Sequence, residues 1–454
     1  MFPSISGSSQ IANTISAADK VYGLSKFWQE VNYNFVYLDK IDRNVWDSTY
    51  KALISQVQET KNDYEYYRLL QKFCALLNDG HTNIYTPKIE GLQIMQNMFG
   101  EHLVVIKRIE GKPVIIRSWK KDQQLLPVGS EIVEVNGMAS EKYLRDSLLP
   151  YISSSTDYVK LNSATHWMLA GAPGSDFNIK IRKPDGRLSQ LQLKHAKTTD
   201  SIYFPEFGKL FDEQKRELLD FKMLNNGVAY VGLNGFSNRK IDTLFDEVLP
   251  KLYNAKGLIL DLRFNGGGST DIGTYILKYL TNDDILQHSR YSTRDHLASF
   301  KAWGKYVSEK DTVNNAWNTK CWLVNNGTYF YQFPYEPDSF ILDKKRVVVP
   351  TVILTGNNTA SAAEDFLIAA DNQKHMIRMG EPSFGSTGQP LVFDLPGGGS
   401  ARVCTKKDTY PDGREFVGYG VLPHIKVAPT IKDYLSGKDV VLEKAIQYLN
   451  NKIK

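Results

Sequence analysis

Apolar and polar positions alternate with a helical period at the start of the chain. Aromatic and aliphatic residues recur every three or four positions in "AADKVYGLSKFWQEVNYNFVYL" and again from Asn44 to Leu77. This spacing puts them on one face of each helix and predicts amphipathic helices that pack together. The period ends at "NDGHTNIYTP", a turn composition that contains His81. We therefore expect residues 1–95 to form a helical domain that carries this turn.

The pattern then changes to short strands. "HLVVIKRIEGKPVIIRSW" is typical of two strands joined by a glycine turn, and "EIVEVNGMASEKYLRDSLLPYI" of a strand, an Asn-Gly turn and a helix. "DFNIKIRKPDGRLSQLQLKHA" predicts a hairpin around the Asp185-Gly186 turn. Residues 96–200 are therefore expected to form a small β-rich module.

Strands and helices alternate in the remainder, residues 201–454, which predicts an α/β layer with a largely parallel sheet. The expected strands are 227–236, 257–265, 346–355 and 375–382, and the expected helices are 242–254, 271–282 and 361–372. The segment 289–343 is aromatic and irregular, and we expect it to be an insertion that covers one edge of the sheet.

Length and charge narrow the function classes. A chain of 454 residues suggests two or three domains. The net charge of +5 is mild, and lysine and arginine are scattered among the acidic residues, so no nucleic-acid footprint is expected. No apolar run approaches the roughly 20 residues that cross a bilayer, so no integral membrane segment is expected. The three cysteines lack metal spacing and are interpreted as buried free thiols.

The first chemically notable stretch is "TGNNTASAAED", where an apolar strand turns into a helix at Ser361. Serine often caps a helix start by accepting a hydrogen bond from a free backbone N–H. A hydroxyl at a strand-to-helix turn is also how several hydrolases present a nucleophile. The stretch alone fits both interpretations.

Two further stretches carry candidate chemistry. Three glycines, Gly266 to Gly268, follow the strand "GLILDLRFN"; they fit a tight turn, and they also fit an oxyanion hole whose backbone N–H faces a reacting carbonyl oxygen. No phosphate-binding glycine motif is present. His81 lies in a turn, where histidine is commonly a plain polar residue, and it gains significance only beside a serine that needs a base.

Six motifs in order resemble the S41 serine peptidases, a family that includes the C-terminal processing proteases and the tricorn-type proteases. The motifs are "LNDGHT", the PDZ-like "LLPVGSEIVEVNG", "GLILDLRFNGGG", "TGNNTASAAED", "GEPSFGSTGQP" and "PDGREFVGYGVLPHIKV". The resemblance implies a crotonase-like α/β catalytic core with an N-terminal helical domain and an inserted PDZ-like module. It implies that Ser361 is the acyl-forming nucleophile. It also implies an oxyanion hole from the N–H groups of Ala362 and Gly267, because relatives carry proline, which lacks an N–H, at the position of Gly266.

The general base is where this sequence departs from the processing proteases. Those enzymes place a lysine in a "TFGKG" segment, whereas the matching "SFGSTG" holds Ser386, 25 residues beyond Ser361. A hydroxyl cannot replace an amine as a base. The tricorn-type branch lacks that lysine and uses a histidine from the turn before the PDZ-like module, which matches His81. The resemblance to that branch therefore implies a Ser/His arrangement.

The third catalytic member is left open by the sequence. Tricorn-type enzymes have a glutamate in an "E-x-x-G" segment, but Val417 stands at that position here. Glu415, Asp412 and Asp79 are candidates to orient His81, and a carbonyl or hydroxyl is an alternative. Glu415 is the carboxylate carried forward as the catalytic candidate.

The resemblance implies a serine endopeptidase that cleaves peptides or unfolded proteins without a metal or cofactor. The alternatives are a non-catalytic ligand- or peptide-binding protein on the same scaffold and hydrolysis of a non-peptide ester or amide. PDZ-like modules bind an extended peptide as an added strand, but here the module is equally interpreted as a lid or spacer. Export to the periplasm or beyond is expected by resemblance, although "MFPSISGSSQIANTISAADK" does not have the pattern of a signal peptide.

Overall fold

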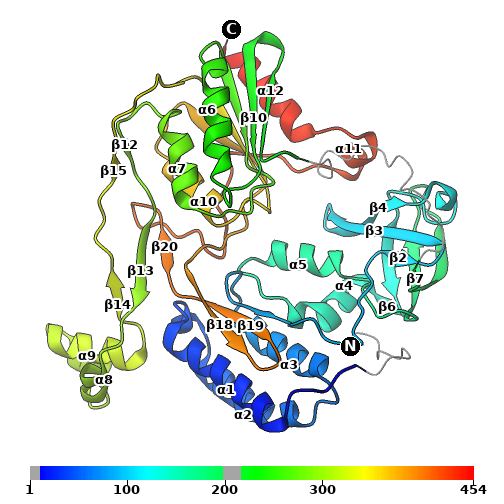
Figure 1. The fold of residues 1–454 in the computed structure, drawn as a ribbon, viewed down its shortest axis with the longest axis vertical. Coiled ribbons are helices and arrows are strands. Elements are labelled where there is room, and N and C mark those ends of the chain that lie inside the picture. Colours follow the sequence, from blue (N-terminus) through cyan, green and yellow to red (C-terminus); the bar gives the residue numbers. More distant parts are fainter. Residues whose placement is uncertain (1–10, 198–215, 454) are drawn as a thin grey trace.

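A six-stranded sheet with the order β21-β17-β16-β11-β10-β9 lies at the centre of the α/β part of the protein (Figure 1). The computed structural model describes residues 11–197 and 216–453. All neighbouring strands are parallel except β9, which is antiparallel to β10. The predicted parallel layer is therefore confirmed, although strand β16 begins only after Pro350. The strands are β9 (Leu219–Met223), β10 (Val228–Leu233), β11 (Gly257–Asp261), β16 (Thr351–Thr355), β17 (Met376–Gly380) and β21 (Ile425–Lys426).

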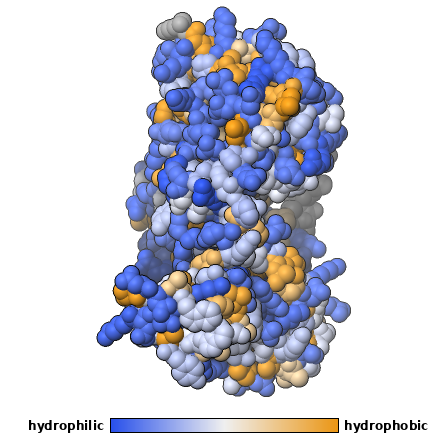
Figure 2. All heavy atoms as spheres, turned by 90° about the vertical axis from the view of Figure 1, so that its left-hand side faces the viewer, coloured by the Kyte–Doolittle hydropathy of each residue, from blue (hydrophilic) through white to orange (hydrophobic). Residues whose placement is uncertain are grey.

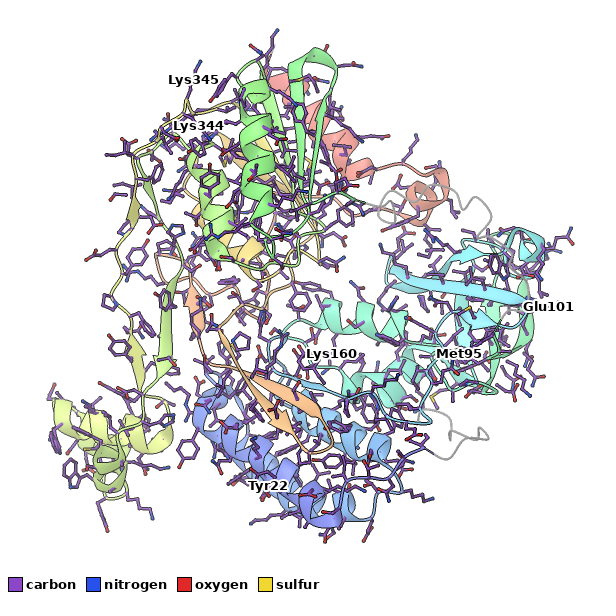
Figure 3. The ribbon with its side chains drawn as sticks, in the orientation of Figure 1. Tyr22, Met95, Glu101, Lys160, Lys344 and Lys345 are labelled. Carbon is purple, nitrogen blue, oxygen red and sulfur yellow. The ribbon has the colours of Figure 1, made fainter. Side chains whose placement is uncertain are left out.

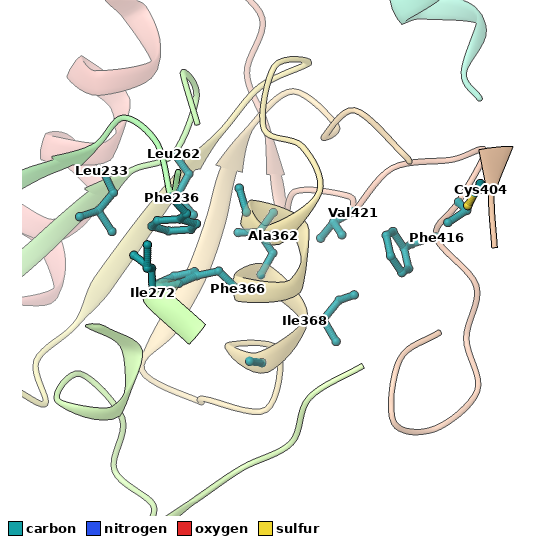
Figure 4. Packing of buried hydrophobic residues seen from close by; sticks show 14 of the residues in the cluster. Leu233, Phe236, Leu262, Ile272, Ala362, Phe366, Ile368, Cys404, Phe416 and Val421 are labelled. Carbon is teal, nitrogen blue, oxygen red and sulfur yellow. The ribbon is translucent and has the colours of Figure 1, made fainter. Parts of the chain in front are cut away.

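Helices cover both faces of this sheet because successive side chains of its strands point to opposite sides. Leu258 and Leu260 of β11 belong to the core under α6, α7 and α10, whereas Ile259 packs with α12 on the other face. Figure 4 shows Phe236 and Ile272 packed against Phe366 of α10. The helices are α6 (Lys240–Leu252), α7 (Thr270–Lys278), α10 (Ala362–Ala369), α11 (Ile431–Ser436) and α12 (Val440–Lys452).

The predicted N-terminal helices are confirmed and pack around aromatic rings. Trp46 and Phe73 stack with ring centroids 3.9 Å apart. Asn62 ends the continuous helical pattern, because its side chain accepts from the Glu65 N–H and starts a new helix. These helices lie against a small sheet of order β1-β19-β18. The elements are α1 (Ala17–Asn34), η1 (Leu38–Lys40), α2 (Arg43–Gln58), α3 (Asp63–Ala75), β1 (Asn83–Tyr85), β18 (Pro390–Leu395) and β19 (Gly399–Cys404).

The β-rich module has its own antiparallel sheet and its own hydrophobic core. The Asn136-Gly137 turn is confirmed, with both residues at positive φ as a tight hairpin requires. The expected module boundary at residue 200 lies outside the described residues. The elements are β2 (Met98–Phe99), β3 (His102–Ile109), β4 (Lys112–Ser118), β5 (Glu131–Val135), β6 (Met138–Ala139), α4 (Ser140–Tyr143), α5 (Asp157–His166), β7 (Asp176–Arg182) and β8 (Leu188–Lys194).

The irregular segment forms an arm, and the expectation that it covers a sheet edge is wrong. Its strand β13 pairs with β14 and β20, while the edge strands of the six-stranded sheet are β9 and β21. The arm runs from the sheet down to the N-terminal helices, where Arg294 donates to the Asn32 carbonyl (2.9 Å) (Figure 1). Its elements are β12 (Ile285–Leu286), β13 (Arg290–Arg294), α8 (Ala298–Gly304), α9 (Ala316–Asn326), β14 (Phe330–Gln332) and β15 (Asp338–Ser339), with β20 (Lys407–Thr409) as partner.

The face of the molecule on the arm side is largely hydrophilic. Figure 2 shows hydrophobic residues there in small, separate groups among hydrophilic ones. No helix in the described ranges is long and apolar enough to cross a membrane.

Candidate active site

Ser361 occupies a strained turn between β16 and α10. Its φ of 55° and ψ of −123° are unusual for a residue with a Cβ. Three bonds hold this turn: the Ser361 N–H donates to Glu364 Oε2 (3.1 Å), the Ala360 N–H to the Asn265 carbonyl (3.0 Å), and Thr359 Oγ1 to the Leu262 carbonyl (2.8 Å). These three bonds fix the backbone without using the Ser361 hydroxyl. That hydroxyl belongs to the capping box at the start of α10 and makes one further contact.

That contact is His81. Its Nε2 lies 3.3 Å from Ser361 Oγ, although the two residues are 280 positions apart in sequence. A serine hydroxyl and an imidazole at this distance have the geometry of a nucleophile and its base before substrate binding shortens the contact. The structure brings these two candidate residues together.

The turn that carries His81 is anchored through Asp79. The buried Asp79 carboxylate accepts from Thr82 Oγ1 (2.6 Å), from Ser155 Oγ (3.2 Å) and from the His81 backbone N–H. Burial raises the pKa of Asp79, and these hydrogen bonds oppose the rise. Asp79 therefore holds the main chain of the turn, and its contacts are not with the imidazole of His81.

The second imidazole nitrogen contacts a hydroxyl. His81 Nδ1 lies 2.7 Å from the Oγ of Ser386, which is fully buried. Sequence reasoning noted Ser386 only as the residue that stands where relatives have a lysine. The signal was present in that substitution, but its contact with His81 depends on the fold.

The structure does not bring Glu415 to His81. The Glu415 carboxylate is 39% exposed and pairs with Lys407 (2.6 Å) and Lys40 (3.6 Å). These lysines lower the pKa of Glu415 and draw its carboxylate to the surface. The other acidic candidate, Asp412, pairs with Arg414.

Burial keeps the imidazole of His81 neutral. Burial, together with the positive charges of Arg402 and Lys406, lowers the pKa of His81 to about 4. At neutral pH the ring is therefore in the unprotonated form that a general base requires.

A buried glutamate that sequence reasoning missed ties the site together. Glu364 Oε2 accepts from the backbone N–H groups of Ser361 (3.1 Å) and Ser386 (3.2 Å), and Oε1 accepts from Ser383 Oγ (2.5 Å) and the Gly385 N–H (2.7 Å). Burial raises the pKa of Glu364 to about 8, and the four donors oppose that rise. The Ser-x-x-Glu spacing from Ser361 to Glu364 is the capping-box signature and was the signal for this contact.

The two candidate oxyanion donors differ in their present partners. The Gly267 N–H donates to Asn265 Oδ1 (2.9 Å). The Ala362 N–H, in the first turn of α10, has no acceptor among the described residues. This is expected, because the first N–H groups of a helix have no earlier helical carbonyl to bond. Both residues adjoin Ser361, because a Cβ on Gly267 would lie 3.0 Å from Ala362 N.

The β-rich module touches the site directly. Tyr158 OH donates to the Ser383 carbonyl (2.5 Å), and Thr156 Oγ1 donates to the Phe384 carbonyl (3.1 Å). Lys160 of α5, labelled in Figure 3, donates to Asn78 Oδ1 (3.3 Å) beside the His81 turn. The module therefore contacts the loop of Ser386 and the turn of His81.

A cavity of about 530 Å³ lies between the β-rich module and the part of the chain built on the six-stranded sheet. It is lined by Lys107 and Trp167 from the module and by Phe264 and Asn357 from the other side. Asn357 precedes Ser361 in the same loop, and Phe264 precedes the three glycines. Ser361 and His81 are not among its lining residues, so the cavity flanks the candidate site.

Comparison with known proteins gives a consistent family. Residues 227–427 match the model of peptidase family S41. The chain is 22% identical to the carboxyl-terminal-processing protease of Picosynechococcus sp. over 410 residues, covering 90% of this chain and 83% of that protein. It is 21% identical to the carboxy-terminal processing protease CtpA of Bacillus subtilis over 473 residues, covering 99% of this chain and 82% of that protein.

Solved structures share the fold at low identity. The structure of mature CPAF complexed with lactacystin superposes with a TM-score of 0.67 at 14% identity, covering 96% of this chain and 98% of that chain. A putative peptidase from Parabacteroides merdae gives a TM-score of 0.50 at 19% identity, covering 96% of each chain. The whole described architecture thus has counterparts among known structures.

Proposed function

Because this chain belongs to peptidase family S41 through residues 227–427, we propose that it is a serine endopeptidase with Ser361 as nucleophile and His81 as general base. The observation that carries this proposal is the 3.3 Å contact between Ser361 Oγ and His81 Nε2. The strained backbone of Ser361 supports it, since such strain is retained where the surrounding structure fixes a functional group. A helix cap alone requires neither the histidine nor the strain.

The mechanism follows from these two groups. His81 Nε2 takes the proton from Ser361 Oγ as that oxygen attacks the peptide carbonyl. His81 then gives the proton to the leaving amine, and the acyl group remains on Ser361. In the second half, His81 takes a proton from water, hydroxide attacks the acyl ester, and Ser361 regains its hydrogen as the acid product leaves.

The oxyanion that forms in each half is assigned to two backbone donors. The Ala362 N–H is free to receive it, and the N-terminal end of α10 adds a favourable dipole. The Gly267 N–H is the second donor. As negative charge develops, it must either leave Asn265 Oδ1 or donate to that oxygen and the oxyanion together.

The presence of histidine in place of lysine supports a place for this protein in the tricorn-type branch of the family. Ser386 stands at the lysine position and cannot accept a proton from Ser361 at neutral pH. His81 is neutral at that pH because burial lowers its pKa to about 4. The base is therefore supplied by the helical N-terminal segment.

The finer organisation is proposed as three units: a helical domain of residues 1–95, a PDZ-like module of residues 96–200 and a crotonase-like catalytic core of residues 201–454. The separate hydrophobic core of the module supports its assignment as a unit. The module's contacts with the site loops favour a role in placing an extended peptide or unfolded chain, with the flanking cavity as the entry side. Family resemblance supports export from the cytoplasm, which fractionation of the source cells tests.

A digest of an unfolded protein tests the proposed function. Purified protein is incubated with reduced, alkylated casein, and the products are sequenced by mass spectrometry. The wild type is expected to release internal peptides, and Ser361→Ala is expected to be slower by on the order of 10⁴-fold or more. A folded wild type that releases no peptides contradicts peptidase activity and favours a non-catalytic binding protein.

A further inference from the structure

We propose that Ser386 is the positioning residue of His81, accepting the Nδ1 proton and so holding the tautomer whose Nε2 can take the proton of Ser361. The inference rests on the proposed function and adds a third member to its Ser/His pair. Its basis is the 2.7 Å contact between His81 Nδ1 and Ser386 Oγ, on the side of the ring opposite Ser361.

Each carboxylate considered for this role is engaged elsewhere. Asp79 accepts from Thr82, Ser155 and the His81 backbone N–H. Glu415 pairs with two lysines at the surface. The hydroxyl of Ser386 therefore occupies the place at Nδ1 that an acid occupies in a Ser-His-Asp triad.

The surroundings fix the position of Ser386. Its N–H donates to the same Glu364 oxygen that accepts the Ser361 N–H, so one carboxylate oxygen sets the spacing of the two serine backbones. On the other side, Gly80 lets Ser386 approach the His81 turn. A Cβ on Gly80 would lie 3.0 Å from both Cβ and Oγ of Ser386 and 2.6 Å from the ring of Phe384.

The proton balance leaves Ser386 unchanged. In the resting tautomer, Nδ1 carries the hydrogen and Nε2 has the lone pair. When Ser361 attacks, its proton moves to Nε2, and the resulting imidazolium still donates from Nδ1 to Ser386 Oγ. No bond to Ser386 forms or breaks, so its contribution is orientation.

A neutral hydroxyl stabilises the imidazolium less than a carboxylate does. The titratable and charged groups around His81 are Asp79 on its own turn, Glu364 on α10, and Arg402 and Lys406 on and after β19. Burial, and after it the cations Arg402 and Lys406, lower the pKa of His81, and among the described residues no carboxylate at Nδ1 opposes them.

The tautomer itself gives the test. Protein labelled with ¹⁵N-histidine is compared as wild type and Ser386→Ala, with His81→Gln used to assign the His81 ring signals at pH 7.5. Wild type is expected to show a protonated Nδ1 and an unprotonated Nε2. In Ser386→Ala the ring is expected to move to a mixture with the Nε2-protonated form.

The rate of Ser361 labelling is measured alongside the NMR comparison. Labelling of Ser361 by a fluorophosphonate is expected to slow by about 10- to 100-fold in Ser386→Ala. The matched control is Ser140→Ala, which removes another buried serine hydroxyl, one that donates to the Ile132 carbonyl within the module. The control is expected to label within about twofold of wild type.

The outcomes separate the two proposals. An unchanged His81 tautomer in folded Ser386→Ala overturns the positioning role, whether or not labelling slows, because a merely structural effect leaves the tautomer in place. Absence of labelling in the wild type overturns the proposed function. The NMR comparison still decides the role of Ser386 in that case, since it needs no turnover.

Discussion

Gly267 lies so close to Ser361 that a methyl group on Gly267 would sit 2.7 Å from the Cβ of Ser361. The same methyl group would lie 2.7 Å from the Ala360 carbonyl oxygen. Gly267 also has a φ of 94°, a backbone conformation that side chains rarely adopt. Glycine is therefore required at this point for two reasons, contact with the nucleophile's loop and backbone conformation.

This contact predicts that Gly267→Ala displaces both Ser361 and a proposed oxyanion donor. Fluorophosphonate labelling is expected to fall by about 10²-fold or more, in line with the loss of one oxyanion donor. The matched control is Gly235→Ala, because a Cβ there meets nothing within 4 Å. If Gly267→Ala were labelled at the wild-type rate, the glycine turn would not shape the site.

The pKa of His81 predicts an unusual pH profile. The base must be neutral, and burial lowers its pKa to about 4, so activity is expected to stay constant from neutral pH down to about pH 5. It then falls below pH 4 as the ring takes a proton. Labelling rates measured across this range, on protein shown to be folded by fluorescence at each pH, give the profile. Half-maximal labelling near pH 6.5, the ordinary value for histidine, would contradict a buried, cation-flanked base.

Glu364→Gln tests the buried carboxylate that joins Ser361 and Ser386. The amide nitrogen of glutamine must face either the two N–H donors on one side or the Ser383 and Gly385 donors on the other. We expect a loss of about 2–3 kcal/mol in the free energy of unfolding by urea. Labelling of Ser361 is expected to slow by about tenfold or more, since both serines shift. An unchanged urea midpoint would mean that these four bonds do not depend on the carboxylate.

Glu415→Gln is expected to be nearly silent. Its carboxylate is partly exposed and bound to Lys40 and Lys407, and surface ion pairs contribute about 0–1 kcal/mol. Labelling is expected to stay within about twofold of wild type. If the folded variant were labelled about tenfold or more slowly, Glu415 would reach His81 in solution and would again be the third catalytic member.

Much of the fold follows from local patterns. The three- and four-residue spacing near the N-terminus predicts the helices, the Asn136-Gly137 dipeptide predicts a turn, and the apolar runs 257–265 and 346–355 predict strands of a largely parallel sheet. These features depend on residues that are neighbours in sequence, so they can be predicted without the structure. The arm was misjudged because its aromatic residues indicate burial of some kind but do not say which surface covers them.

Some features of the site can likewise be predicted from local sequence, and others depend on the fold. Ser361 and His81 are marked by their turns, and Glu364 by its spacing from Ser361. The contact of His81 with Ser386 spans 305 positions and depends on Gly80 leaving room for the serine. No local pattern encodes that approach. Glu415 was favoured by its place near the expected acid. Its direction is set instead by Lys40, which is distant in sequence, and by Lys407 of β20.

The most direct test of the account is fluorophosphonate labelling read by mass spectrometry in wild type, Ser361→Ala and His81→Ala. The account predicts a single adduct on Ser361 in the wild type, none at that position in Ser361→Ala, and a rate lower by on the order of 10³-fold or more in His81→Ala. No adduct in folded wild-type protein, or an adduct whose rate does not depend on His81, would contradict a Ser/His peptidase.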